Sequence, residues 1–256
     1  MPNYDIFIPV RLSNTRLPSK AMKLVDDKPI ILYLIERVLK SKKIRNVIVC
    51  TTTNESDDPL VTLLEKMNIL VFRGDEKDIL TRYLDASKKF DTDYIISIDG
   101  DDIYTDPNYV DEIISIFEKT DCDYVDMIGF PFGIASVGIK VTALEKICKL
   151  KTSDNTETGY RLFFTENKIF NVYELKPSKD FSFPKNIRLT LDYKEDLDLA
   201  SKIFHELGND FHLEDIIGLF KKNPELLQLT NNLEERYKQH WDKNVAKTHL
   251  KDIHTD

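Results

Sequence analysis

A loop near the N-terminus gathers positive charge in a pattern that suits phosphate chemistry. Residues 11–23 contain no acid and four cations: Arg11, Arg16, Lys20 and Lys23. A guanidinium can hold two phosphate oxygens at once, and an ammonium acts as a compact point charge. Ser13 and Thr15 add hydroxyl donors to the same loop. The loop therefore favours a polyphosphate ligand, with a solvated basic loop as the alternative.

Carboxylates gather at two other places in the chain. Asp99, Asp101 and Asp102 fall within four residues, directly after the apolar residues 94–98. Such close carboxylates repel one another unless a cation or water separates them, and Mg²⁺ commonly binds one or two carboxylates together with substrate phosphates. Asp192 also follows an apolar run. Because ligands of open α/β sheets bind at the carboxyl ends of strands, the pattern predicts a metal–triphosphate site, with a solvated acidic turn as the alternative.

The composition bounds the class of protein. With 256 residues, 41% of them hydrophobic, the chain can form one large domain or a main domain with a small appendage. A net charge of −8 argues against a nucleic-acid partner. No run of about 20 apolar residues predicts a membrane span, and the N-terminus does not resemble a secretion signal. The three cysteines have no paired spacing, so we expect a cytoplasmic protein.

The order of apolar runs predicts an α/β fold. Expected strands at residues 6–10, 47–51, 69–72 and 94–98 alternate with expected helices at residues 29–40, 57–66, 78–89 and 106–118. This alternation predicts a largely parallel sheet with helices on both faces. We expect the later strands, at residues 124–130 and 136–141, to be antiparallel additions that cover the mouth of the sheet.

The rest of the chain mixes short elements with C-terminal helices. Further elements are expected at residues 170–175 and 187–191 (strands), and at residues 193–207 and 213–220 (helices). Leu233, Tyr237, Trp241 and Val245 recur every four residues, which predicts a helix whose stripe packs in the core or against another subunit. All five histidines lie in the last fifth of the chain, where solvated positions are expected. We predict a domain over residues 1–210, with an acceptor or dimerisation insertion at residues 120–180, and a helical extension over residues 211–256.

Several segments carry a resemblance to one family. Residues 8–20 resemble the signature P-A-R-x-x-S-x-R-L-P-x-K of the cytidylyltransferases that activate acidic sugars, such as 3-deoxy-manno-octulosonate and acylneuraminate. Residues 51–59 and 71–83 are similar to the SpsF-like branch, and residues 190–197 to its element T-x-D-x-P-E-D-L. The resemblance implies a nucleotide-diphospho-sugar transferase fold, Rossmann-like and GT-A-type, forming a three-layer sandwich around a mixed, mostly parallel sheet. It also implies transfer of CMP from CTP with Mg²⁺ and release of pyrophosphate.

The same resemblance implies roles for individual residues. Arg11, Lys20 and Asp101 would be catalytic, and Asp101 and Asp192 would hold the metal ion. The implied nucleotide-binding set is Pro9, Val10, Arg11, Ser13, Arg16, Lys20, Thr51, Thr52, Thr53, Arg73 and Asp99. CTP and a small-molecule acceptor are the implied partners, and a homodimer is the family-level expectation.

The acceptor half departs from the family pattern. Thr158 stands where the SpsF-like branch tends to have His, and Lys194 where it has Pro. The acceptor is therefore expected to be either an acidic sugar or a phosphorylated small molecule, giving a CMP- or CDP-linked precursor of surface polysaccharide. A glycosyltransferase of the same fold is the alternative function. It would bind a nucleotide-sugar and would not need so dense a cationic loop.

Overall fold

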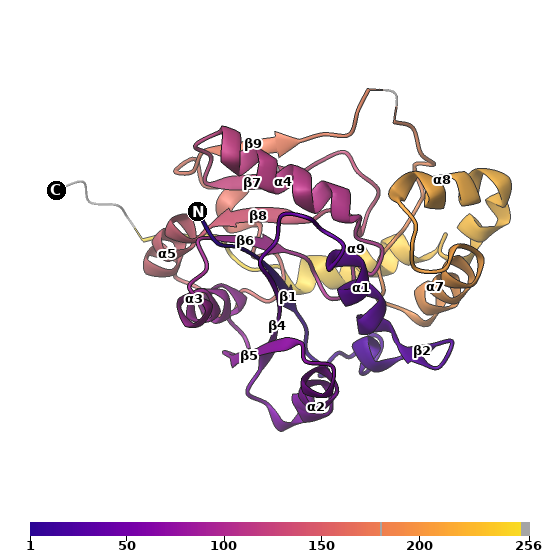
Figure 1. Cartoon of the computed structure of the whole chain (residues 1–256), viewed down its shortest axis with the longest axis horizontal. Coiled ribbons are helices and arrows are strands. Elements are labelled where there is room, and N and C mark those ends of the chain that lie inside the picture. The colour runs from indigo at the N-terminus through magenta and orange to yellow at the C-terminus, as the bar shows by residue number, and fades with distance from the viewer. Residues whose placement is uncertain (180, 252–256) are drawn as a thin grey trace.

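A seven-stranded sheet forms the centre of the molecule (Figure 1). The computed structural model describes residues 1–179 and 181–251. The strands lie in the order β5-β4-β1-β6-β8-β7-β9. Their bounds are β1 (Tyr4–Pro9), β4 (Asn46–Thr52), β5 (Leu70–Gly74), β6 (Tyr94–Ser97), β7 (Tyr124–Met127), β8 (Val137–Lys140) and β9 (Val172–Leu175). β2 (Leu24–Val25) and β3 (Lys28–Pro29) form a separate antiparallel ribbon.

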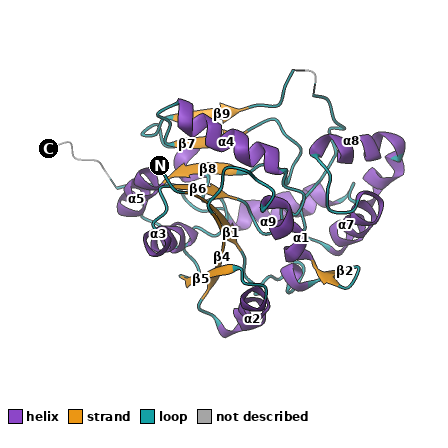
Figure 2. Cartoon of the chain, in the orientation of Figure 1, coloured by secondary structure: helices purple, strands orange, loops and turns teal. Residues whose placement is uncertain are grey.

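Helices cover both faces of this sheet (Figure 2). One face carries α1 (Ile30–Val38), α2 (Asp58–Lys66) and α4 (Pro107–Lys119). The other carries α3 (Ile79–Phe90), α5 (Val141–Leu150) and α6 (Leu162–Thr165). The predicted three-layer α/β architecture with a mixed, mostly parallel sheet is confirmed.

The sequence of β1 explains why this strand lies at the centre. Ile6 and Ile8 pack with α1, α2 and α4, whereas Phe7 between them packs with α3. All three side chains are fully buried. A strand covered by helices on both sides reads as a continuous apolar run because successive side chains point to opposite faces. The carboxyl end of β1 therefore delivers the cationic loop to the middle of the sheet edge.

The predictions about the later strands are confirmed for β8, which is antiparallel as expected, and are otherwise wrong. Only β8 runs antiparallel to its neighbours, because β7 pairs in parallel with β9 and both follow the direction of β6. These strands extend the sheet sideways and do not cover its mouth. Residues 187–191 form one isolated bridge, between Phe132 and Arg188, and no strand of the sheet. The Leu189 amide donates to the Phe132 carbonyl at 2.8 Å and the Leu191 amide to the Asp101 carbonyl at 3.0 Å. The segment is therefore held by two loops at the carboxyl edge.

The C-terminal helices continue the main body. α7 (Lys194–Leu207) and α8 (Leu213–Lys222) share an apolar cluster with residues of α1, so the predicted boundary at residue 210 falls inside one packed region. The 3-10 helix η3 (Pro224–Leu229) leads to α9 (Leu233–Asn244), the yellow helix that crosses the middle of Figure 1. The chain then returns to α5, where the Lys251 amide donates to the Leu150 carbonyl at 2.8 Å. Among the described residues, no helix is both long and apolar enough to cross a lipid bilayer.

Candidate active site

The carboxyl ends of β1 and β6 open into one cavity of about 730 Å³. The turn after β6 packs closely on β1, since a Cβ on Gly100 would lie 2.4 Å from Val10 Cγ2. Of the residues predicted from the sequence, the cavity is lined by Pro9, Val10, Arg11, Ser13, Arg16, Lys20, Asp99, Asp101 and Asp192. The structure thus brings the cationic loop and the distant carboxylates into one cavity, as the sequence predicts.

The cationic loop is held in shape by hydrogen bonds to its backbone. The Asn14 side chain accepts from the amides of Arg16 and Leu17 at 3.0 and 3.1 Å, which is the local turn that Asn favours. The Leu12 amide donates to the buried Asp57 carboxylate at 2.7 Å. Ser19 has a left-handed backbone, φ 53°, and begins the 3-10 helix η1 (Lys20–Met22). These contacts aim Arg16 and Lys20 at the cavity.

Lys20 bridges the two predicted metal-binding carboxylates. Its Nζ lies 2.5 Å from Asp101 Oδ2 and 3.1 Å from Asp192 Oδ1. Burial opposes the charge on the lysine, but the two carboxylates outweigh it, so the pKa of Lys20 is raised. For Asp192 the cost of burial is outweighed by Lys20 and Arg16, and its pKa is lowered. Burial dominates at Asp101, whose pKa is raised although Lys20 opposes the shift.

Asp192 is supported from a second side. Arg188 Nη2 donates to its Oδ2 at 2.9 Å, and Arg16 Nη2 lies 2.6 Å from its Oδ1. Asp196 holds Arg188 at 2.9 Å and accepts the backbone amides of Asp192 and Tyr193 at 2.9 Å each. The start of α7 therefore fixes both the backbone and the carboxylate of Asp192. Arg16 Nη1 is buried without a hydrogen-bond partner, which leaves a donor available for an anionic ligand.

Asp99 belongs to the opposite half of the cavity. Its Oδ1 accepts from the Tyr160 hydroxyl and its Oδ2 from Arg161, each at 3.1 Å. Arg161 also donates to the Ala135 carbonyl at 2.8 Å, just before β8. Asp102 lines the cavity below them, and burial, followed by repulsion from Asp101 and Asp99, raises its pKa well above the ordinary value. This half therefore combines one cation with several carboxylates.

Glu157 is a cavity residue that the sequence did not single out. Its carboxylate pairs with Arg11 at 3.4 Å and with the buried Arg82 at 2.7 Å. Arg82 also donates to the Asp75 carbonyl at 2.5 Å. The only sequence signal was its place in the segment of residues 156–159, which departs from the family pattern. Glu157 thus links α3 to the loop that follows β1.

Four residues predicted to bind the nucleotide do not line the cavity. The hydroxyls of Thr51 and Thr52 are buried and donate to Asp57 Oδ2 at 2.9 and 2.6 Å. Thr53 is exposed. Arg73 donates to the Thr52 carbonyl at 2.9 Å and pairs with Asp58 at 2.7 Å. These residues build the support beneath the cationic loop, because Asp57 connects the two threonines to Leu12.

The stripe on the last helix faces the cavity. The structure places four residues of α9 in its lining: Tyr237, His240, Trp241 and Asn244. Leu233 of the same stripe is buried, as expected for core packing. Tyr237 and Trp241 line the cavity instead, and His240 is half-buried beside them. A subunit contact of this stripe stays a prediction. Burial, followed by repulsion from Arg16, lowers the pKa of His240. The four-residue spacing predicted the face but not what the face meets.

The donor set at the cavity floor fits a hard divalent cation. Asp101 and Asp192 offer carboxylate oxygens on either side of one point, the position that the Lys20 ammonium takes. No group of three or more His, Cys, Asp or Glu side chains in the described part of the chain could hold a metal by itself. Two carboxylates completed by substrate phosphates is the arrangement that Mg²⁺ favours. The cavity can therefore hold a polyphosphate between cations and a metal-binding floor.

Comparison with known proteins agrees with this chemistry. The spore coat polysaccharide biosynthesis protein SpsF of Bacillus subtilis is 26% identical, and the match covers 85% of this chain and 94% of that protein. An uncharacterized protein of Methanocaldococcus jannaschii is 32% identical, with 90% and 95% covered. A 3-deoxy-manno-octulosonate cytidylyltransferase of Hydrogenovibrio crunogenus is 28% identical, with 64% and 65% covered.

A solved structure and a family model complete the comparison. The structure of a cytidylyltransferase from Leptospira borgpetersenii superposes with a TM-score of 0.80 at 28% identity, covering 89% of this chain and 98% of that one. These matches favour nucleotidyl transfer over the alternative of a glycosyltransferase. A family model described as cytidylyltransferase matches residues 6–217. With most of its length matched and its strand-end residues gathered in one cavity, the chain belongs to the cytidylyltransferase family.

Proposed function

We propose that this enzyme transfers CMP from CTP to an acidic sugar, with Mg²⁺ as cofactor and pyrophosphate as the second product. One observation carries the proposal: Arg16, Lys20, Asp101 and Asp192 meet within hydrogen-bond distance at the carboxyl edge of the sheet. Cations to hold phosphates and carboxylates to hold a metal are the two parts that phosphoryl and nucleotidyl transfer require.

The chemistry follows from how charge moves in the reaction. An acceptor hydroxyl oxygen forms a bond to the α-phosphorus of CTP while the bond from that phosphorus to the bridging oxygen breaks. Pyrophosphate leaves with the electron pair of the broken bond, and the hydroxyl proton passes to water. Arg11, Arg16 and Lys20 bind the triphosphate and stabilise the charge that builds up on the departing pyrophosphate. Positioning and electrostatic stabilisation supply most of the rate enhancement in such transfers.

Asp101 and Asp192 are the residues that would hold Mg²⁺. A bound Mg²⁺ ion neutralises phosphate oxygens and so lowers the barrier to attack by an anionic or neutral oxygen. Arg188 holds the Asp192 carboxylate and Asp196 holds Arg188, while Asp101 follows a turn that packs closely on Val10. Lys20 pairs with both carboxylates and would bind phosphate oxygens at the same place.

Two observations support an acidic sugar as the acceptor: the kinds of protein among the relatives, and the cation Arg161 in the cavity. The relatives include a protein of spore coat polysaccharide biosynthesis and a 3-deoxy-manno-octulosonate cytidylyltransferase. Arg161 provides a guanidinium in the half of the cavity formed by Asp99 and the residues before β8. We propose a precursor of surface polysaccharide as the product, and the cytoplasm as its place of synthesis, which suits the three free cysteines.

The direct test measures pyrophosphate release from CTP and Mg²⁺ with a panel of acceptors. The panel contains 3-deoxy-manno-octulosonate, N-acetylneuraminate and several sugar phosphates. We expect release that depends on CTP and on a carboxylated sugar. The variants Lys20→Ala and Asp101→Asn should each lower kcat by about 10²-fold, the usual loss for one preorganised charge contact. Lys194→Ala is the matched control, because Lys194 is exposed and pairs with Asp198 on the same helix.

Each outcome has a defined meaning. Release with a sugar phosphate alone would replace the acidic sugar by a phosphorylated acceptor. Turnover of a nucleotide-sugar without pyrophosphate would favour a glycosyltransferase. Wild-type rates in the folded Lys20→Ala and Asp101→Asn variants would reject the assigned roles.

A further inference from the structure

α9 is fixed across the cavity at both of its ends. Near its N-terminus, Arg236 pairs with Glu195 of α7 at 3.1 Å, and Leu233 is buried. Just past its C-terminus, the Ala246 amide donates to the Thr158 carbonyl at 2.8 Å. The helix therefore spans from α7 to the loop before α6. All of α9 lies beyond the residues that the family model matches, which end at residue 217.

One face of this helix points into the cavity. Tyr237, His240, Trp241 and Asn244 follow one another at intervals of three, one and three residues, which places them on neighbouring rows of the same side. Lys238 and Gln239, between them in sequence, are exposed and do not line the cavity. The face therefore offers two aromatic rings together with an imidazole and a carboxamide.

This face reaches both halves of the cavity: the Tyr237 ring lies 5.7 Å from Arg16 Cζ of the cationic loop, whereas Trp241 lies beside Gly159 on the acceptor half. Tyr237 packs edge-on against Phe132, which precedes β8, with ring centroids 4.8 Å apart. A Cβ on Gly159 would lie 2.9 Å from Val245 Cγ2 and 3.6 Å from the Trp241 ring. Gly159 also has a φ of +84°, so a glycine is needed both for the backbone and for the close approach of α9. Thr51 and Arg73, which support the nucleotide half, donate hydrogen bonds to Asp57 and to the Thr52 carbonyl instead.

We propose that α9 is the acceptor-binding wall of the active site, with Trp241 packing against the ring of a carbohydrate acceptor. His240 and Asn244 then bond its hydroxyl groups. An aromatic face beside polar groups matches a sugar ring, which presents C–H groups on its faces and hydroxyls at its rim. This inference rests on the proposed function, because it assumes that a carbohydrate enters the half of the cavity near Arg161.

The sequence supplies an internal probe for this inference, since Trp241 is the only tryptophan in the chain. Its emission is measured while CTP with Mg²⁺, and then each sugar of the acceptor panel, is added to the full-length protein. We expect little change with CTP and a clear change of intensity or wavelength with a carbohydrate. A full response to CTP with none to any sugar of the panel overturns the proposal.

Substitutions at Trp241 separate binding from catalysis. Trp241→Ala should raise the KM for the acceptor about tenfold, the equivalent of about 1.4 kcal/mol of lost aromatic packing. The KM for CTP should stay within about twofold. Trp241→Phe should restore most of the acceptor affinity because it keeps an aromatic ring. Gln239→Ala, on the exposed side of the same helix, is the matched control and should resemble the wild type.

The result distinguishes this inference from the proposed function. If the wild type releases pyrophosphate but Trp241→Ala keeps the wild-type KM for the acceptor, α9 is not the acceptor wall although the reaction stands. If sugars change the emission of Trp241 without any pyrophosphate release, the wall binds carbohydrate and the proposed reaction fails. Equal losses in Trp241→Ala and Gln239→Ala would point to a purely structural role.

Discussion

A single buried carboxylate, that of Asp57, holds the cationic loop in shape. Asp57 is fully buried and joins β1 to β4, because it accepts from the Leu12 amide and from the hydroxyls of Thr51 and Thr52. Asp57→Asn places a donor opposite the Thr52 amide, which now donates to Oδ2 at 3.2 Å. We expect the free energy of unfolding to fall by about 1–3 kcal/mol, as for other unsatisfied buried groups.

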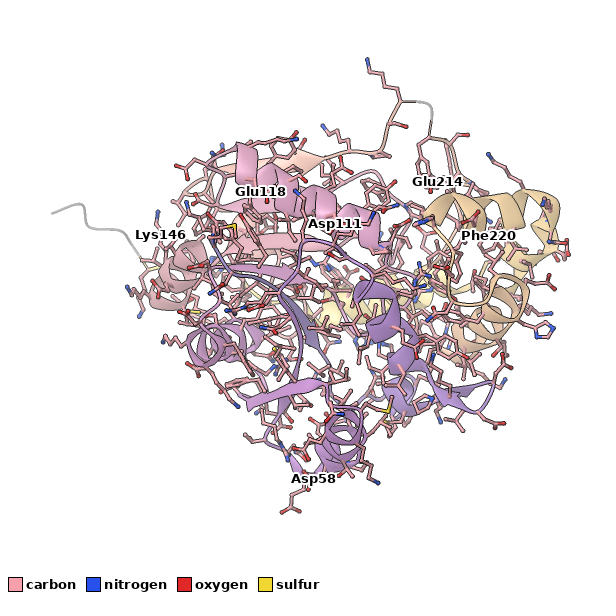
Figure 3. The ribbon with its side chains drawn as sticks, viewed as in Figure 1. Asp58, Asp111, Glu118, Lys146, Glu214 and Phe220 are labelled. Carbon is pink, nitrogen blue, oxygen red and sulfur yellow. The ribbon has the colours of Figure 1, made fainter. Side chains whose placement is uncertain are left out.

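The same substitution should raise the KM for CTP, because the cationic loop loses an anchor. Denaturant unfolding and initial-rate kinetics measure the two effects. Asp58→Asn is the neighbouring control, since Figure 3 shows Asp58 at the outer rim of α2 and its side chain is half exposed. Equal behaviour of the two variants would contradict the role given to Asp57.

At the scale of residues, the sequence predicted which side chains lie at the edge of the sheet better than it predicted which way those side chains point. Arg16, Lys20, Asp101 and Asp192 were predicted from loops that follow apolar runs, because loops after strands lie at the carboxyl edge of a sheet. The structure places all four in the cavity at that edge, although the apolar run before Asp192 is not a strand. Thr51 and Thr52 also end a strand, yet their hydroxyls turn toward Asp57. Which way a strand-end side chain points depends on a partner six residues away, and that partner is visible only once the turn is built.

Two helices on one face of the sheet are tied together by a buried ion pair. Asp78 caps the N-terminus of α3, accepts from the Thr156 hydroxyl at 2.8 Å, and pairs with Lys151 after α5. Burial alone would raise the pKa of Asp78, but the hydrogen bonds from Lys151, Thr81 and Thr156 outweigh it and the pKa is lowered. A carboxyl with a depressed pKa stabilises the fold above its ordinary value of 3.8, and this contribution is lost as the pH falls below it.

The pH dependence of melting tests this pair. We expect the wild type to lose more stability than Asp78→Asn when the pH is lowered from about 6 to about 3, because only the wild type has this carboxylate to protonate. Thermal melting of both proteins across this range gives the difference. Parallel loss in both proteins would show that Asp78 has no depressed pKa.

At the scale of elements, periodicity was sufficient wherever the surroundings were apolar. The strands β1, β4, β5 and β6 and the helices α1, α2 and α3 lie where the pattern predicted, although β5, at the edge of the sheet, is only half-buried. Residues 187–191 looked like a strand since they are apolar, but loops at Asp101 and Phe132 claim their backbone hydrogen bonds. The four-residue spacing predicted that the α9 stripe forms one face of a helix. It did not predict that this face lines a cavity, because the cavity has no periodic pattern in the sequence.

For the whole molecule, we propose a homodimer formed along β9, which is one of the two edge strands of the sheet. β9 pairs with β7 on one side only, and Tyr173 is 41% exposed on that edge. Trp241, the other surface considered, faces the active site instead. An unpaired edge offers backbone groups to a second copy. Light scattering coupled to size exclusion should give twice the mass of one chain, and Tyr173→Lys should shift the equilibrium toward the monomer.

A single-chain mass for the wild type at every concentration would contradict the dimer. The sequence predicted oligomerisation only through the family, because nothing in an edge strand of four residues distinguishes a free edge from a paired one. Whether a strand has a free edge depends on the order of strands, and this order is known only once the complete sheet is formed.

The course of the chain also dictates when the active site is finished. The cationic loop leaves the ribosome before α9, which lines the same cavity. Domains synthesised in this direction fold behind the ribosome as their contacts become available. In a nascent chain stalled before residue 233, the cationic loop and the carboxylates would lie in a cavity with one side open to water. Ribosome-bound intermediates should therefore bind nucleotide before they discriminate among sugars.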